Sequence, residues 1–88
     1  MIRREVRVRS LEVIECKTSM AVRFYLVDQP TSVIEYISPD DELVLIDLSS
    51  GRCLSVRHIV TMNIGVGEGM QYIEIAAGRI DPTVVMWP

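Results

Sequence analysis

The chain has 88 residues, 49% of them hydrophobic, and a formal net charge of −3. This length allows one domain with a modest core, and so small a net charge argues neither for nor against an anionic partner overall. The mean hydropathy of +0.27 is high for a small soluble monomer. Because monomers seldom expose large apolar patches, we expect a homo-oligomer.

The first half of the chain is expected to form three strands. Over residues 2–15 apolar side chains alternate with arginine and glutamate, and the apolar parity changes after Ser10. This change predicts a β-bulge near Arg9 and Ser10, or a corner between two strands. Pro39 follows Ser38 and predicts a turn over residues 38–41. The expected strands of this half span residues 2–15, 20–27 and 32–37.

The clearest β-hairpin lies over residues 42–64. Its two apolar arms flank Ser49-Ser50-Gly51, and the glycine can take the positive φ that a tight reversal needs. Residues 43–48 are apolar on both parities, which is typical of a strand covered on both faces. The second arm alternates, which is typical of one buried and one exposed face, and its parity places His58 on the buried face.

The last third of the chain predicts shorter elements. Three glycines in residues 65–69 predict a flexible link, followed by a strand over 71–77, a turn over 78–82 and a closing strand over 83–87. No helix of ten or more residues fits any part of the sequence. The chain is therefore expected to be all-β: a single small antiparallel meander of six to seven short strands over residues 1–88, closing as a barrel or a sandwich.

Cysteine content and hydropathy bear on the compartment. Cys16 and Cys53 are the only cysteines, and the N-terminus lacks the apolar segment of a secretion signal. Free thiols in the cytoplasm are the simplest interpretation, with a disulfide left as the alternative. No stretch is long enough to span a membrane, so we expect a cytoplasmic protein without a membrane contact.

No catalytic or metal-binding constellation stands out. His58 is the only histidine and is either a general base or an imidazole buried in the core or an interface. Cys53 and Ser55 have the opposite parity to His58, so a nucleophile pair within this strand is not expected. The acidic run 40–42 lacks calcium-loop spacing. We therefore expect no catalytic residue, metal or cofactor.

The best binding candidates are arginines. Arg3, Arg7 and Arg9 alternate along the first predicted strand, and Arg57 lies in the central hairpin. Arginine favours planar, bidentate contacts with phosphate or carboxylate, so these four residues suit a nucleotide or nucleic acid. The alternative is a solvated strand face on which the N-terminal arginines pair with the neighbouring glutamates, Glu5, Glu12 and Glu15.

A short resemblance to PilZ domains involves two motifs. Residues 3–7 fit an RxxxR pattern, and Asp47-Leu48-Ser49-Ser50-Gly51 is similar to the start of the DxSxxG signature. PilZ domains are small β-barrels that bind cyclic di-GMP through these motifs, so the resemblance implies a cyclic dinucleotide as a ligand. The likeness covers some ten residues, Arg52 occupies the position of the final glycine, and the motifs are more widely separated than usual.

The C-terminal residues suggest an interface. Val84, Met86 and Trp87 make this end unusually apolar, and chain ends fray unless they are docked. Together these patterns favour a non-enzymatic β module that self-associates and binds a protein partner. The alternatives are a nucleotide or nucleic-acid phosphate binder that uses the arginines, and an enzyme that uses His58.

Overall fold

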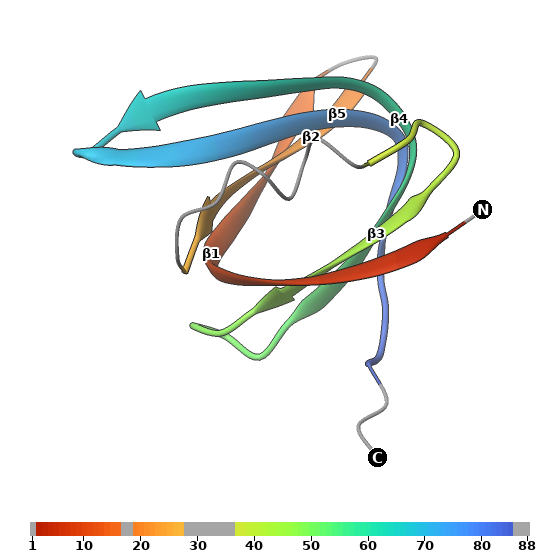
Figure 1. The fold of residues 1–88 in the computed structure, drawn as a ribbon, viewed down its shortest axis with the longest axis horizontal. Helices are drawn as coiled ribbons and strands as arrows, with labels where there is room; N and C mark the ends of the chain where they lie inside the picture. Colours follow the sequence, from red (N-terminus) through yellow and green to blue (C-terminus); the bar gives the residue numbers. More distant parts are fainter. Residues whose placement is uncertain (1, 17–18, 28–36, 86–88) are drawn as a thin grey trace.

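The computed structural model describes residues 2–16, 19–27 and 37–85. Its strands are β1 (Arg3–Cys16), β2 (Ser19–Leu26), β3 (Glu42–Asp47), β4 (Cys53–Gly67) and β5 (Met70–Pro82) (Figure 1). No helix occurs in these ranges, which confirms the all-β prediction and leaves them without a helical segment able to cross a membrane.

The sheet closes on itself in the order β1-β2-β5-β4-β3. β1 closes the sheet because it pairs with two strands: Arg3–Val8 pairs with β3, and Val8 together with residues 10–16 pairs with β2. The register shifts between Val8 and Ser10, which confirms the predicted bulge and bends the strand. The sheet differs from a plain meander, since β2 lies beside β5 and the β1–β3 pair is parallel. The other four pairs are antiparallel.

The described residues contain five strands, where six to seven were predicted. The expected turn over residues 78–82 is wrong, because β5 continues through them to Pro82. The expected closing strand is also not formed over residues 83–85. The predicted strand 32–37 lies outside the described residues except for Ile37, which belongs to no strand but is buried in the core.

β4 and β5 bend together where His58 lies beside Gly78, between the Arg57–Arg79 and Ile59–Ala77 pairs. His58 has a φ of 56°, which is uncommon for a residue other than glycine. A Cβ built on Gly78 would lie 3.1 Å from the His58 Cβ, so glycine gives the bend its room. Val56 points into the core before the bend and Ile59 after it, and His58 is exposed. The prediction of a buried His58 is therefore wrong, because the bend interrupts the alternation.

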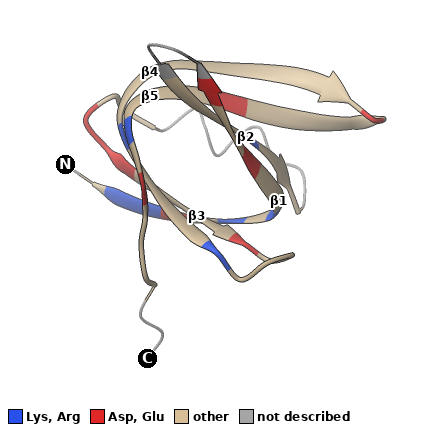
Figure 2. Ribbon diagram, turned by 180° about the vertical axis from the view of Figure 1, so that it is seen from behind, with Lys and Arg blue, Asp and Glu red and all other residues tan. Residues whose placement is uncertain are grey.

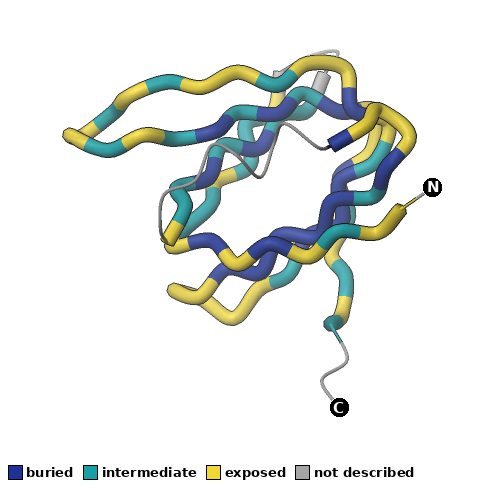
Figure 3. Tube along the Cα trace, in the orientation of Figure 1, coloured by how far each residue is buried: buried dark blue, intermediate teal, exposed yellow. Residues whose placement is uncertain are grey.

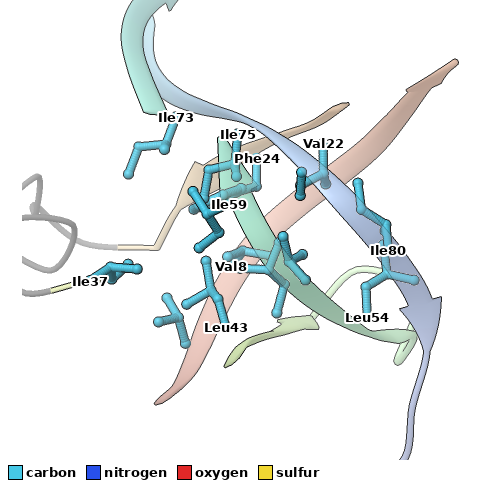
Figure 4. Close-up of a cluster of buried hydrophobic side chains, with 14 residues drawn as sticks. Val8, Val22, Phe24, Ile37, Leu43, Leu54, Ile59, Ile73, Ile75 and Ile80 are labelled. Atoms are coloured by element: carbon cyan, nitrogen blue, oxygen red, sulfur yellow. The ribbon is translucent and has the colours of Figure 1, made fainter. Parts of the chain in front are cut away.

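The core fills the inside of the closed sheet (Figure 4). β3 is buried on both faces, as predicted: Leu43 and Leu45 belong to the core, while Val44 points the other way and is also fully buried. Every strand contributes side chains that are at most 1% exposed: Val8, Val22, Phe24, Leu43, Leu45, Val56, Ile73 and Ile75. This rigid centre positions the projecting part of the sheet.

Candidate interaction surface

The outer parts of β4 and β5, residues 59–77, form a hairpin arm that projects from the bend (Figure 1). The reversal at its tip uses only Glu68 and Gly69, with φ values of 54° and 77°. Two positive φ values in a two-residue loop are typical of a type I′ turn, which matches the twist of the strands it joins. The predicted flexible glycine link is therefore wrong, because Gly65 and Gly67 belong to β4.

The two strand glycines make room for a tyrosine ring on the outer face of the arm. Gly65 pairs with Tyr72 across the strands. A Cβ on Gly65 would lie 2.3 Å from the Tyr72 Cζ, and a Cβ on Gly67 would lie 3.3 Å from its Cε2. The Tyr72 ring thus covers the strand where the glycines have no side chains of their own.

Around this ring lies an aromatic–arginine cluster, made of Arg23, Tyr25, Tyr72 and Glu74. The Arg23 Cζ lies 4.2 Å from the Tyr72 ring centroid, within cation–π range. Arg23 donates from Nη2 and Nε to the Glu74 Oε2 at 2.8 and 3.0 Å, and this hydrogen bonding raises the Arg23 pKa above its usual value. The Tyr25 ring meets Tyr72 edge-on at 5.8 Å. The cluster is a preorganised polar surface.

The arm carries an apolar rim, made of Val60, Ile64 and Val66. Ile64 pairs with Ile73, so its side chain lies on the core side of the sheet. Exposure nevertheless increases toward the tip, to 49% at Ile64 and 71% at Val66 (Figure 3). Val60, at the register shift between Ile59 and Thr61, is 73% exposed.

The same part of β4 carries no charged side chain. Residues 58–67 contain no Asp, Glu, Lys or Arg, and Figure 2 shows β4 in tan from the bend toward the tip of the arm. β3 pairs with β4 only from Cys53 to Val56, so β5 is the one described strand that pairs with the arm section of β4. Soluble sheets usually protect such an edge with charge or proline.

Two of the four predicted binding arginines meet at one carboxylate. The Nε atoms of Arg3 and Arg57 lie 3.9 and 3.8 Å from the Glu42 carboxylate. The Ser55 hydroxyl donates to the Glu42 Oε2 at 2.5 Å. The Glu42 side chain is only 13% exposed, whereas the arginine side chains are 47% and 40% exposed. Acidic and basic residues therefore alternate here (Figure 2).

The other two arginines lie further along β1. Arg7 pairs in register with Ile46, close to the turn that follows β3. Arg9 reaches the opposite end of the molecule, where its Nη1 donates to the Met70 Sδ at 3.0 Å, beside the tip of the arm. The structure brings Arg3 and Arg57 together and places Arg9 elsewhere.

The PilZ-like tract is a turn organised by its own aspartate. Asp47 is 3% exposed and accepts hydrogen bonds from the Ser49 amide and hydroxyl at 2.9 and 2.7 Å and from the Ser50 hydroxyl at 2.7 Å. Burial acts to raise the Asp47 pKa, but these hydrogen bonds outweigh it and hold the pKa below its usual value. Gly51 supplies the positive φ, 77°, that was predicted for this reversal.

The acidic run before β3 also forms a turn, as predicted. The Asp41 amide donates to the Ser38 carbonyl at 2.9 Å. Its carboxylate accepts from the Ser38 amide at 3.0 Å and from the Arg4 Nε at 3.2 Å, and the Ser38 amide is the main cause of a lowered Asp41 pKa. Within the described ranges, no three His, Cys, Asp or Glu side chains are placed to hold a metal.

The C-terminal end of the described chain lies beside the β3–β4 hairpin. The Thr83 amide donates to the Cys53 carbonyl at 3.0 Å, and Cys53 is a free thiol. Val84 is 73% exposed, in a shallow groove that Ile46 and Leu48 also line. The other two predicted interface residues, Met86 and Trp87, lie outside the described residues.

Comparison with known proteins found no matching protein-family model, no matching curated protein and no matching solved structure. Sequence reasoning missed the aromatic–arginine cluster. Its one detectable signal is the pair Gly65 and Gly67 shortly before Tyr72, since glycines within a strand favour a covering ring.

Proposed function

We propose that this protein is a non-enzymatic binding and assembly module that self-associates through the apolar rim of its hairpin arm. One observation carries the proposal: a ten-residue uncharged section of β4, residues 58–67, in which Val60 and Val66 are more than 70% exposed. Contact between water and these exposed apolar side chains is unfavourable, and burial against another surface removes it.

The opposite face of the arm supplies the surface for a protein partner. Tyrosine and arginine are enriched among residues that dominate binding energy in interfaces, and Arg23 and Tyr72 are already held together. The side chains of Arg23 and Glu74 remain 31% and 32% exposed, so a partner can reach their remaining polar atoms. Self-association through the rim leaves this outer face open.

Replacing Val66 with lysine is expected to disrupt self-association. The change places a charge in the apolar contact and should raise the dimer dissociation constant by at least about tenfold, equivalent to about 1.4 kcal/mol. Because Val66 is 71% exposed, the fold should persist, as judged by circular dichroism. Sedimentation equilibrium measures the dissociation constant.

Leu48→Lys is the matched control, since Leu48 is an exposed apolar residue in the turn after β3, away from the arm. Its dissociation constant should equal that of the unmodified protein. If Val84→Lys separates the subunits while Val66→Lys does not, self-association depends on the C-terminal segment and the assignment to the arm is wrong. A protein that stays monomeric at high concentration contradicts the proposal as a whole.

Phosphate binding by the arginines is a second candidate, supported by the sheet register. Arg3, Arg57 and Arg79 lie at one level across the sheet, because Arg3 pairs with Glu42, Arg57 pairs with Arg79, and Leu43 pairs with Val56. Three guanidinium groups from three strands can contact neighbouring phosphates. Glu42 competes with such a ligand for Arg3 and Arg57.

The second candidate predicts a salt-dependent loss of binding. Arg3→Ala with Arg57→Ala should weaken binding of a labelled single-stranded oligonucleotide and lower its log–log salt slope by about 0.7 for each lost phosphate contact. Glu42→Gln should strengthen the same binding, because it removes the competing charge. Fluorescence anisotropy at several salt concentrations gives both values. Arg52→Ala, in the exposed turn after β3, is the control, and an unchanged slope in the double variant contradicts phosphate binding.

A further inference from the structure

The edge of β4 in the hairpin arm is long and regular enough to pair with another strand. Its register with β5 is continuous from Thr61 to Gly67. The shift between Ile59 and Thr61 limits this section on one side, and the positive φ of Glu68 limits it on the other. A bulge and a turn both end regular pairing, so seven residues are available.

We propose that two copies of this chain pair through these sections, antiparallel and around a two-fold axis at Ile64. This inference rests on the proposed function and specifies its geometry. In a contact around a two-fold axis, if residue i of one copy lies opposite residue j of the other, then residue j of the first copy also lies opposite residue i of the second. Ile64 is the middle of residues 61–67, so centring the contact there pairs the whole section.

Side-chain placement supports this register. Cross-strand neighbours point to the same side of a sheet, so Met62 faces Val66 of the second copy and Ile64 faces Ile64. These three residues lie on the core side of the arm. The contact therefore joins Met62, Ile64 and Val66 of the two copies into one apolar strip, and Val60 of the rim lies outside the paired section. On the outer face, Asn63 meets Gly65 and Thr61 meets Gly67, and the Tyr72 ring that covers these two glycines lies beside the contact.

Charge favours a second copy as the occupant of this edge. When a strand pairs with its own copy, its charged residues lie near residues of the same charge in the second copy, and this is destabilising. Residues 61–67 have none. β1 offers a contrast: from Ser10 to Cys16 it pairs, among the described strands, only with β2, but it carries Glu12 and Glu15, both exposed. The charged edge is protected from self-pairing, and the β4 edge is suited to it.

Cysteine cross-linking tests the register. In a parent protein with Cys16→Ser and Cys53→Ser, Ile64→Cys places two thiols directly opposite each other, with Cα atoms about 4.5–5.5 Å apart, within disulfide range. Asn63→Cys, the matched control, places its thiols diagonally at about 7–8 Å, beyond that range. After oxidation with diamide, we expect most Ile64→Cys protein to run as a disulfide-linked dimer and Asn63→Cys to stay uncrosslinked.

The oligomeric state of the parent protein distinguishes a failure of self-association from a failure of the proposed register. Light scattering should give it twice the 10.0 kDa mass of one chain, and circular dichroism should show the same sheet spectrum for both cysteine variants. A dimeric parent whose Ile64→Cys variant does not cross-link, or whose Asn63→Cys variant cross-links instead, overturns this register and leaves self-association intact. A monomeric parent overturns both.

Discussion

Phe24→Ala is expected to destabilise the protein by about 3–5 kcal/mol. Phe24 is 1% exposed and lies in the middle of β2, paired with Leu11 on one side and Ile73 on the other (Figure 4). Removing its ring costs the transfer free energy of the buried carbons and leaves a cavity that a closed sheet cannot collapse to fill. Urea unfolding followed by circular dichroism gives the free energy of unfolding.

The loss should be a large part of the total stability. Domains are stable by about 5–15 kcal/mol, and one of this size buries a comparatively small fraction of its surface. Leu48→Ala, at a position that is 55% exposed, should change the free energy of unfolding by less than about 0.5 kcal/mol. Both variants are compared at one protein concentration, because the proposed self-association would add to the apparent stability. A cost below about 1 kcal/mol for Phe24→Ala is incompatible with the packed core described above.

Alternation along the chain predicted several features of this fold correctly. The parity change after Ser10 marks the bulge of β1 because a bulge adds one residue to a period of two. The apolar run of β3 marks a strand covered on both faces, because the side chains on both faces are apolar and neither face suits contact with water. Such local signals identify strands and their buried faces.

The pairing of distant strands and the bend at His58 were not predictable in the same way. The β1–β3 pair is parallel and depends on how a closed sheet fits together. Gly78 and Pro82 suggested a turn, although Gly78 gives room for the bend and Pro82 stands at the end of β5, where proline is tolerated. Histidine occurs at positive φ more often than most residues do, but its residue type alone does not predict that His58 takes this conformation.

The candidate surfaces show the same division between local and long-range information. The sequence identifies the arginines but not Glu42 between Arg3 and Arg57, because that contact joins three strands. The sequence also shows an excess of apolar residues. Which of these side chains stay exposed depends on how far the arm extends beyond the packed core. Ile64 and Ile73 are cross-strand neighbours, yet their exposures are 49% and 1%.

Asp47→Ala is expected to cost about 2–4 kcal/mol, because it removes a buried carboxylate that accepts three hydrogen bonds. Hydrogen bonds to a charged acceptor contribute more than neutral ones, and the Ser49 and Ser50 hydroxyls lose their partner. The β3–β4 turn should loosen while the core stays packed. Denaturant unfolding at neutral pH measures the cost. Asp40→Ala, an exposed carboxylate in the turn before β3, is the control and should change little.

The contribution of Asp47 to the free energy of unfolding should also decrease as the pH falls. Its folded-state pKa lies below the usual value, so the folded protein favours the charged form more than the unfolded chain does. The stabilisation is complete above the unfolded pKa of about 3.9, decreases as the pH falls below it, and is lost below the folded pKa.

Asp47→Asn keeps the shape of the side chain without its charge. Asp41 also has a lowered pKa, but it is present in both proteins, so its contribution cancels in the comparison. The difference in free energy of unfolding between the unmodified protein and Asp47→Asn should therefore be constant from neutral pH to about pH 5 and shrink below about pH 4. A difference that grows with acidity would contradict the hydrogen bonding of Asp47, because only a carboxylate with a raised pKa gains stability on protonation.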